Sequence, residues 1–200
     1  MPDAPRYPTG TVRALIESDA VTAPTRAALL ARLDAPAPGA PRFLDAAAFA
    51  TLAAACARLL RPAHEGAPLA VAAGIDARLA DGEGNGWRYD ALPPDGEAYR
   101  LGLRGLDEAA RAAGSASFAA LDGERQDAIL AAVQRGDVAG GVWDALPAAR
   151  WFEEWLAETC ELHYAHPLAQ ERIGYAGMAD APGWPHVGPG ELEPREPRPL

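Results

Sequence analysis

The amino-acid sequence predicts an all-α fold: a single irregular bundle of about 5–7 helices, with a helical arm before it and an extended, proline-rich tail after it. Alanine fills 47 of the 200 positions, which favours helices that approach one another closely. Apolar residues recur at helical spacing in several segments. No segment alternates apolar and polar residues for long enough to indicate a β-strand.

Residues 1–42 are predicted to form the N-terminal arm. Two short helices are expected, over residues 11–19 and 25–34, with Pro24 in the opening turn of the second, where proline is tolerated. Residues 35–41 read Ala-Pro-Ala-Pro-Gly-Ala-Pro, which is typical of a stiff linker. The arm is therefore expected to be joined to the main body by an extended segment.

The main body is predicted over residues 43–187, and its first helix begins after Asp45, an expected N-cap. Leu44 and Phe49 flank this cap at the spacing of a hydrophobic staple. Pro62 is expected to end the helix. The predicted buried side is the apolar stripe of Phe49, Leu52, Cys56 and Leu59.

Three further helices are predicted over about residues 68–80, 96–113 and 123–135. Gly102 and Gly105 lower the intrinsic helix propensity of the second, so close packing against a neighbour is expected there. The expected boundary residues are Asp95 and Asp122 as N-caps, with Gly114 and Gly136 just past the ends. The predicted buried residues are Val71, Ile75, Leu79, Tyr99, Leu103, Leu106, Ala110, Ile129, Leu130 and Val133.

The last predicted helix, residues 148–164, has an apolar arc of roughly 180°, wider than the ~100° stripe that an ordinary surface helix buries. The excess suggests contact with two neighbours, and the second neighbour could be another protein chain. The opposite side is interpreted as a solvated acidic surface and holds Glu153, Glu154, Ala157, Glu158 and Glu161.

Aromatic residues gather toward the C-terminal part of the chain. Aromatic side chains dominate both hydrophobic cores and interface hot spots, so the sequence leaves a partner interface and an internal core as open alternatives. The tail, residues 188–200, is rich in proline and is expected to be disordered or extended along a partner. The candidate interface residues are Trp87, Tyr89, Trp151, Phe152, Trp155, Tyr175 and Trp184.

The composition argues against several classes of function. The formal net charge is -10, and all 18 basic residues are arginines without a basic cluster, so binding to nucleic acid is not expected. The absence of lysine excludes Schiff-base chemistry and a P-loop lysine. No catalytic or cofactor-binding residue is predicted, because none of the three serines lies in a strand-turn-helix elbow.

The histidines and cysteines give only weak indications of a site. His163 and His166 lie three residues apart near Glu158 and are the only metal candidates. The alternative is that a histidine at a helix end satisfies terminal carbonyl groups. Cys56 and Cys160 match no metal or redox spacing, so they are interpreted as two buried thiols or, alternatively, as a disulfide within the chain or with a partner.

No signal peptide and no membrane span is predicted. The first twenty residues contain no apolar core, and the most apolar stretch, residues 46–60, is shorter than the ~20 residues that a bilayer requires. The chain is therefore expected to stay in the cytosol, or to leave it only when a partner carries it.

An ordered set of short motifs runs through the body of the chain. It consists of Phe43-Leu44-Asp45, Leu59-Leu60-Arg61-Pro62, Ala73-Gly74-Ile75-Asp76-Ala77-Arg78-Leu79, Tyr99-Arg100-Leu101-Gly102-Leu103-Arg104-Gly105-Leu106-Asp107, Phe118-Ala119-Ala120-Leu121, Trp151-Phe152-Glu153-Glu154, His166-Pro167 and Ile173-Gly174-Tyr175-Ala176-Gly177. With these motifs, the chain resembles the gluconate 2-dehydrogenase subunit 3 family from about residue 43 to residue 184.

The resemblance implies a small helical subunit of a flavin-dependent sugar or polyol dehydrogenase. In such systems a large subunit of the glucose-methanol-choline oxidoreductase group holds FAD, and a cytochrome c subunit with haem c often accepts the electrons. The small subunit holds no cofactor and has a chaperone-like role, supporting the folding or maturation of the large subunit.

Two features of the resemblance leave alternatives open. Small subunits of this kind often carry an export signal, and no such signal is recognised in this sequence. The complex is therefore expected to be cytoplasmic, or periplasmic if the partner carries the signal. The alternative functions are a stand-alone helical metal-binding enzyme and a helical interaction protein that associates with itself.

Overall fold

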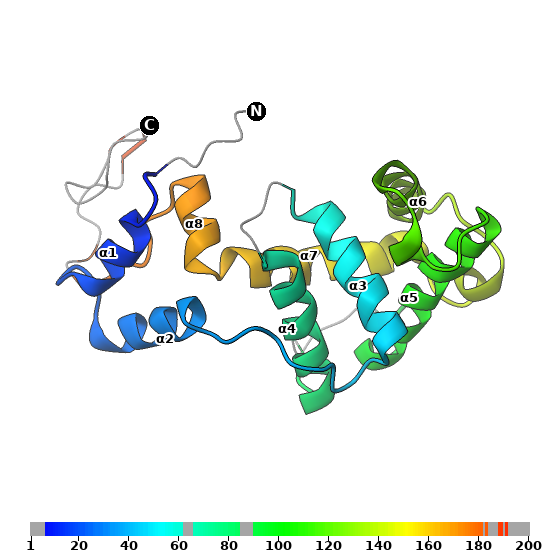
Figure 1. The fold of residues 1–200 in the computed structure, drawn as a ribbon, viewed down its shortest axis with the longest axis horizontal. Helices are drawn as coiled ribbons and strands as arrows, with labels where there is room; N and C mark the ends of the chain where they lie inside the picture. The colour runs from blue at the N-terminus through cyan, green and yellow to red at the C-terminus, as the bar shows by residue number, and fades with distance from the viewer. Residues whose placement is uncertain are drawn as a thin grey trace. The chain divides into compact units, whose positions relative to one another are not determined.

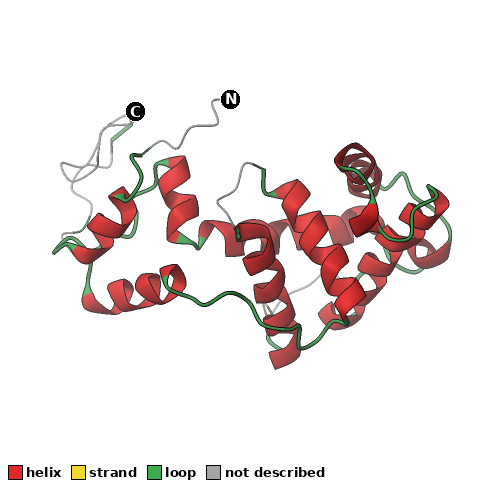
Figure 2. Cartoon of the chain, in the orientation of Figure 1, coloured by secondary structure: helices red, strands yellow, loops and turns green. Residues whose placement is uncertain are grey.

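The computed structural model describes residues 7–61, 66–84, 90–181, 183, 188–189 and 191. Within these residues the regular structure is entirely helical and contains no strand, which confirms the all-α prediction (Figure 2). The α-helices are labelled in Figure 1, and two short 3-10 helices, η1 and η2, lie between them. The bounds are α1 Thr11–Glu17, α2 Ala23–Leu33, α3 Ala46–Leu59, α4 Ala67–Asp81, α5 Asp95–Ala112, η1 Phe118–Ala120, α6 Gly123–Arg135, η2 Gly141–Asp144, α7 Ala148–Tyr164 and α8 Pro167–Ile173.

The chain forms two compact units. The smaller unit combines Met1–Pro36 with His163–Leu200, and the larger unit is Ala37–Leu162. Each unit has its own hydrophobic core. The N-terminal helices thus share a core with residues that follow α8, a pairing that the predicted division into an arm and a body does not include.

The larger unit is built around α3, which packs along α4 and also contacts α5 and α6 (Figure 1). Most residues of the predicted apolar stripes are buried, whereas Phe49, Leu59 and Ile129 are half-buried and pack against the core. The predicted core residues that the structure buries are Leu52, Cys56, Val71, Ile75, Leu79, Tyr99, Leu103, Leu106, Ala110, Leu130 and Val133.

Two glycines of α5 let large aromatic rings approach the helix backbone. A Cβ atom at Gly102 would lie 2.0 Å from Cε2 of Trp151, and one at Gly105 would lie 2.4 Å from Cζ2 of Trp143. Carbon atoms pack at about 3.5–4.0 Å, so neither position has room for a side chain. The close packing expected at these glycines is confirmed.

Two of the three predicted N-caps are present. The carboxylate of Asp45 accepts the backbone N–H of Ala48 at 2.8 Å, and that of Asp122 accepts the N–H of Arg125 at 3.0 Å. Each bond satisfies a backbone donor that the first turn of a helix leaves open.

The third predicted cap is wrong. Pro94 is the N-cap residue of α5, and Asp95 lies inside the first turn, where a carboxylate also interacts favourably with the helix dipole. The side chain of Asp95 is engaged elsewhere, because its Oδ2 atom accepts from Arg78 at 2.8 Å.

A buried carboxylate fixes the entry of the chain into the larger unit. Asp76, in α4, is only 2% exposed, and it accepts the backbone N–H groups of Arg42 at 2.6 Å, Phe43 at 3.1 Å and Leu44 at 2.8 Å. Hydrogen bonds from several N–H groups offset the free-energy cost of burying a carboxylate. Asp76 therefore holds the segment before α3 against α4.

The smaller unit contains α1, α2 and α8, and two carboxylates organise its backbone. Glu171 is 6% exposed and accepts the N–H groups of Gly10 and Val12, each at about 3.0–3.1 Å, so it caps the start of α1. Asp180 accepts the N–H of Thr22 at 2.7 Å and the hydroxyl groups of Thr22 and Thr25, both at 2.7 Å. Residues far apart in the sequence are joined in this way.

The carboxylate of Asp180 is expected to make the smaller unit sensitive to acid. Hydrogen bonds from the backbone and hydroxyl of Thr22 and from the hydroxyl of Thr25 lower the pKa of Asp180 to about 2, below the value of ~3.9 in an unfolded chain. A lowered folded-state pKa contributes stability above the unfolded value, and that stability is lost as the pH falls toward the folded value. The midpoint temperature of thermal unfolding should therefore decrease as the pH is lowered from about 4 to about 2. Thermal melts followed by circular dichroism measure this temperature.

Two variants test this expectation. In Asp180→Asn, the midpoint temperature should decrease less over the same pH range. In Thr25→Val, which removes one hydrogen-bond donor to Asp180, the decrease should begin at a higher pH. If the wild-type protein and Asp180→Asn lose stability equally, Asp180 is not the group that titrates.

Candidate functional site

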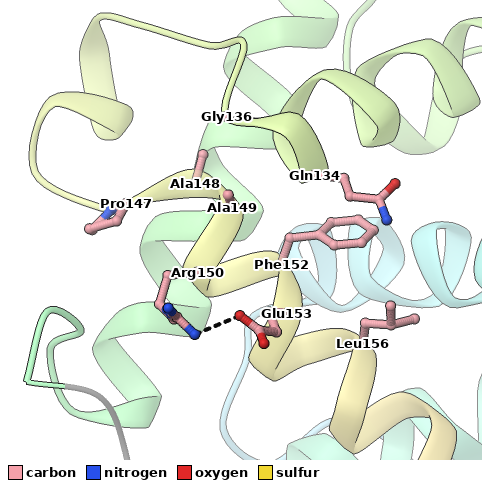
Figure 3. Close-up of a pocket in the computed structure, with 9 residues that line it drawn as sticks. All are labelled: Gln134, Gly136, Pro147, Ala148, Ala149, Arg150, Phe152, Glu153 and Leu156. Atoms are coloured by element: carbon pink, nitrogen blue, oxygen red, sulfur yellow. Dashed lines mark hydrogen bonds and ion pairs between the residues drawn. The ribbon is translucent and has the colours of Figure 1, made fainter.

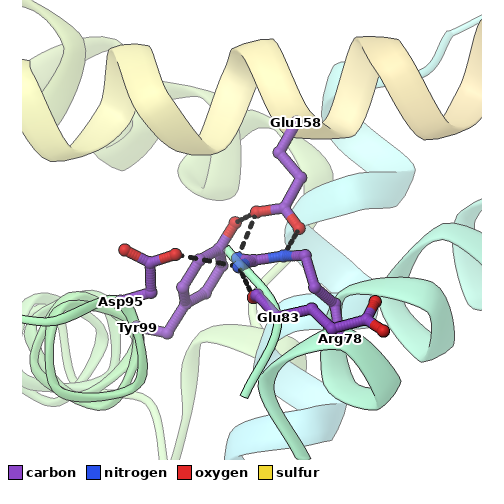
Figure 4. Close-up of polar contacts among 5 residues, drawn as sticks. All are labelled: Arg78, Glu83, Asp95, Tyr99 and Glu158. Carbon is purple, nitrogen blue, oxygen red and sulfur yellow. Dashed lines mark hydrogen bonds and ion pairs between the residues drawn. The ribbon is translucent and has the colours of Figure 1, made fainter. Parts of the chain in front are cut away.

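The most elaborate polar cluster of the larger unit lies where α4, α5 and α7 meet (Figure 4). The guanidinium group of Arg78 donates to Glu158, with Nη2 to Oε2 at 2.8 Å and a second bond from Nε to Oε1. It also donates to Oδ2 of Asp95 at 2.8 Å and to the backbone carbonyl of Glu83 at 2.6 Å. The hydroxyl of Tyr99 donates to the same carboxylate of Glu158.

The surroundings shift the pKa values of Arg78 and Tyr99 in this cluster. Burial acts to lower the pKa of Arg78, but the hydrogen bonds and charges of Glu158 and Asp95 outweigh it and raise that pKa. Burial, together with the charge of Glu158, raises the pKa of Tyr99 well above its ordinary value. Arg78 is therefore a permanent cation and Tyr99 a neutral hydrogen-bond donor.

The cluster has no room for a substrate. The adjoining cavity, lined by Trp151 and Glu154 among others, has a volume of about 30 Å³, enough for a single water molecule. The hydrogen bonds drawn in Figure 4 join Arg78 to Glu158, Asp95 and the backbone of Glu83, and Tyr99 to Glu158. The arrangement therefore fastens three helices together.

The position of Glu158 corrects the interpretation of α7. The sequence placed Glu158 with the solvated acidic residues, but the structure buries it, with only 7% exposed. Glu153 and Glu161 are exposed and Glu154 is half-buried, so the acidic outer side of α7 is real but narrower than predicted.

Three of the predicted interface aromatics are core residues. Trp151, Phe152 and Trp155 are 2%, 4% and 0% exposed, so none of them presents a surface to another chain. Trp151 stacks on Trp155 with ring centroids 5.3 Å apart, and Phe152 meets Trp155 edge-on at 5.5 Å. The wide apolar arc of α7 is filled by this chain's own helices, which corrects the assignment of these residues to a partner interface.

Both cysteines are free thiols. Burial raises the pKa of Cys56 to about 12. Cys160 is partly buried, and burial raises the pKa of its thiol too. The structure contains no disulfide between them; Cys56 is a buried thiol as predicted, whereas Cys160 is only half-buried. A disulfide with a partner stays a prediction.

The histidines form part of the corner between α7 and α8. Nδ1 of His166 accepts the backbone N–H of Leu168 at 3.2 Å, so His166 caps the start of α8. Burial lowers the pKa of His163, and the charges of His166 and Arg172 lower it further. Burial also lowers the pKa of His166, although a hydrogen bond with the backbone of Arg32 acts in the opposite direction. Among the residues that the structure describes, no group of three or more His, Cys, Asp or Glu side chains is arranged to hold a metal ion.

A shallow groove lies where the end of α6 meets the start of α7 (Figure 3). Its volume is about 610 Å³, and an ion pair between Arg150 and Glu153, at 2.6 Å, lies along it. The other lining residues are mostly small or apolar. They are Gln134, Gly136, Pro147, Ala148, Ala149, Phe152 and Leu156.

The large apolar side chains exposed in the described part of the chain all fall between residues 164 and 175. They are Tyr164, Leu168, Ile173 and Tyr175, which are 46%, 39%, 44% and 51% exposed. Tyr175 is thus at the surface, as a partner-binding residue must be. The sequence analysis did not assign the other three to an interface: Tyr164 is the last residue of α7, and Leu168 and Ile173 lie in α8, which is too short for a clear apolar pattern. Trp87, Tyr89 and Trp184, the remaining interface candidates, lie outside the described residues.

The geometry defines a class of protein. The described residues form an all-helical protein in which buried polar groups hold helices together and large apolar side chains are exposed between residues 164 and 175. The chain belongs to the gluconate 2-dehydrogenase subunit 3 family, whose model matches residues 46–183. It is therefore a subunit of a dehydrogenase built from several chains, which implies partner proteins.

Other comparisons add nothing to this assignment. No curated protein matches the chain, and no solved structure matches it. None of the helices in the part of the chain that is described is long and apolar enough to cross a membrane.

Proposed function

We propose that this chain is the non-catalytic small subunit that binds and stabilises an FAD-containing large subunit of the glucose-methanol-choline group, in a dehydrogenase that oxidises a sugar or polyol. The observation that carries the proposal is membership of the gluconate 2-dehydrogenase subunit 3 family over most of the chain. The structure supports it because the buried carboxylates are engaged inside the fold: Glu158 joins α7 to α4 and α5, and Asp76 holds the segment before α3.

FAD belongs to the partner in this proposal. Dinucleotide-binding folds cradle the pyrophosphate in a glycine-rich turn between a strand and a helix. The described residues of this chain contain helices and no strand, so they do not offer such a turn. The large subunit would take a hydride from a hydroxyl-bearing carbon, and a cytochrome c subunit with haem c would accept the electrons.

The small subunit would act through binding alone. A protein that binds the folded, FAD-loaded large subunit and not its unfolded chain shifts the folding equilibrium by mass action. At a concentration 100 times the dissociation constant, this linkage is worth about 2.7 kcal/mol. The complex would be cytoplasmic, or periplasmic if the large subunit carries the export signal.

Co-expression tests the proposal directly. The chain should be produced with and without the FAD-type dehydrogenase encoded beside it, with a tag on the dehydrogenase only. We expect the two proteins to co-purify, and the yield of soluble, FAD-loaded dehydrogenase to rise several-fold when both are present. A dehydrogenase that is equally soluble and active alone, and that does not retain this chain, would overturn the proposal.

The alternative functions make different predictions for the chain alone. A metal-binding enzyme would contain stoichiometric metal after purification and would turn over a substrate without a partner. A self-associating protein would form an oligomer in light scattering and would not exchange it for a complex with the dehydrogenase.

A further inference from the structure

Two helices that precede the family match pack on a segment that lies inside it. The match begins at residue 46, after α1 and α2, and it includes α8 and the residues that follow α8. Both α1 and α2 contact α8. We call residues 7–34 the cover and residues 165–181 the covered face. The cover is thus an element outside the family match that rests on a part of the family match.

Hydrogen bonds attach the cover to the covered face. Nη1 of Arg32 donates to the carbonyl of Ala165 at 3.0 Å, and the N–H of Ala181 donates to the carbonyl of Ala20 at 3.0 Å. The carboxylate contacts of the smaller unit also run between these two segments. Water replaces the lost partner when such a bond opens, so each attachment adds only modestly to the stability of the closed arrangement.

Other polar contacts lie wholly within the cover and make it one piece. Arg26 of α2 donates from Nε to the carbonyl of Ile16 and from Nη2 to the carbonyl of Val21, both at 2.9 Å. Arg13 of α1 pairs with Asp34 at 2.7 Å. These contacts do not involve the covered face, so separation of the cover from that face leaves them intact.

The apolar contact between the cover and the covered face is small. Among the described residues the core of the smaller unit has nine buried apolar side chains, whereas that of the larger unit has 25. The free energy of a local opening depends on the apolar surface that it exposes, so the smaller core should open first. The cover contributes Tyr7, Val12, Leu15, Ile16, Val21 and Leu29, and the covered face contributes Ala176, Met178 and Ala179.

Residues 35–41 connect the cover to the larger unit. The segment contains no helical residue, and five of its seven residues are exposed. Its three prolines have no backbone N–H to donate. A change in the course of this segment therefore breaks no helix and exposes no core.

We infer that the cover is a releasable element, which separates from the covered face as one piece about residues 35–41 while the larger unit stays folded. Release uncovers Met178 and its apolar neighbours, so the cover controls whether this part of the family match is exposed. The inference is independent of the proposed function, because it concerns contacts within a single chain.

Native-state amide hydrogen exchange of the full chain tests the inference. Helices as short as α1 and α2 are marginal in water once they lose their packing, so release of the cover should let their amides exchange. We expect them to exchange through one common opening, at least ~100-fold faster than the protected amides of α3 and α5. Equal opening free energies for both sets would show that the chain unfolds as a single unit and would overturn the inference.

Two exposed carboxylates supply a matched pair of variants. Asp180→Ala removes attachments between the covered face and the cover, and it should raise the exchange rates of α1 and α2 at least ~10-fold. Asp34→Ala removes an exposed ion pair inside the cover and should change these rates less than ~3-fold. Exchange in α3 and α5 should stay unchanged in both variants. Equal effects of the two variants, or equal acceleration in α3 and α5, would contradict separate opening of the cover.

Cutting the linker gives a readout that does not depend on exchange. A protease recognition sequence inserted between Pro38 and Gly39 of the full chain lets the cover be cut from the rest after folding. On dilution the cover should elute separately in size-exclusion chromatography. The near-ultraviolet circular dichroism of the stacked Trp151 and Trp155 should persist. A cover that cannot be separated by dilution, or a signal that disappears when the cover leaves, would overturn the inference.

Discussion

Replacing Glu158 with alanine is expected to lower the free energy of unfolding by about 3–5 kcal/mol. The carboxylate is 7% exposed and binds both Arg78 and Tyr99, so its removal leaves a partly buried cation and a buried hydroxyl without their main acceptor. Leaving one member of a buried ion pair unpaired costs more than the pair itself contributes. Urea denaturation followed by circular dichroism measures the change.

A second acid on the same helix supplies the control. Glu153 pairs with Arg150 at the surface, with 61% of its side chain exposed, and Glu153→Ala should cost less than about 1 kcal/mol because exposed pairs contribute little. The combined variant Arg78→Met/Tyr99→Phe/Glu158→Met removes all the polar groups together and should be more stable than Glu158→Ala. Equal losses for Glu158→Ala and Glu153→Ala would contradict the buried cluster.

The ends of most helices were predictable because they depend on local chemistry. Asp45 and Asp122 are caps that act within three residues, and α7 has the bounds that its apolar pattern predicted. The α8 helix was missed for a local reason as well. It has seven residues and is capped by His166, which is not among the side chains that ordinarily mark a helix start.

The assignment of buried and exposed residues on α7 needed the tertiary structure. Glu158 is buried because Arg78, 80 positions earlier in the chain, binds it, and no local pattern reveals that partner. The apolar arc of α7 correctly indicated two neighbours, but a helical wheel does not distinguish another chain from other helices of the same chain. Trp151 is a core residue because its ring packs on Gly102 of α5, and Trp155 is buried in the same core.

The structure divides the acidic residues into buried ones that bind other segments and exposed ones that cover the surface. Asp76 and Glu171 are buried carboxylates that accept N–H groups of segments distant in the sequence, and Glu158 does the same for side chains. Part of the negative charge therefore serves as internal attachment, while the exposed part, including Glu153 and Glu161, covers the outer side of α7.

Replacing Gly102 with alanine is expected to destabilise the larger unit by about 2–3 kcal/mol, although alanine is the better helix former by about 1 kcal/mol. The new methyl group would lie 2.0 Å from Cε2 and 2.2 Å from Cζ2 of Trp151. That indole has no space to move, because it is 2% exposed and stacks on Trp155. Overpacking against a rigid ring therefore outweighs the gain in helix propensity.

Gly74→Ala is the matched control, since Gly74 also lies inside a helix of the larger unit. Its new methyl group would lie 3.3 Å from Cδ1 of Leu162, the end of a flexible side chain that is able to shift. This variant should be neutral or more stable than wild type by up to about 1 kcal/mol. The two substitutions should change the free energy of unfolding in opposite directions, which distinguishes the effect of packing from that of helix propensity. Urea denaturation of both variants measures the two changes. If Gly102→Ala stabilised the protein as Gly74→Ala does, Trp151 would not pack on α5 as the structure shows.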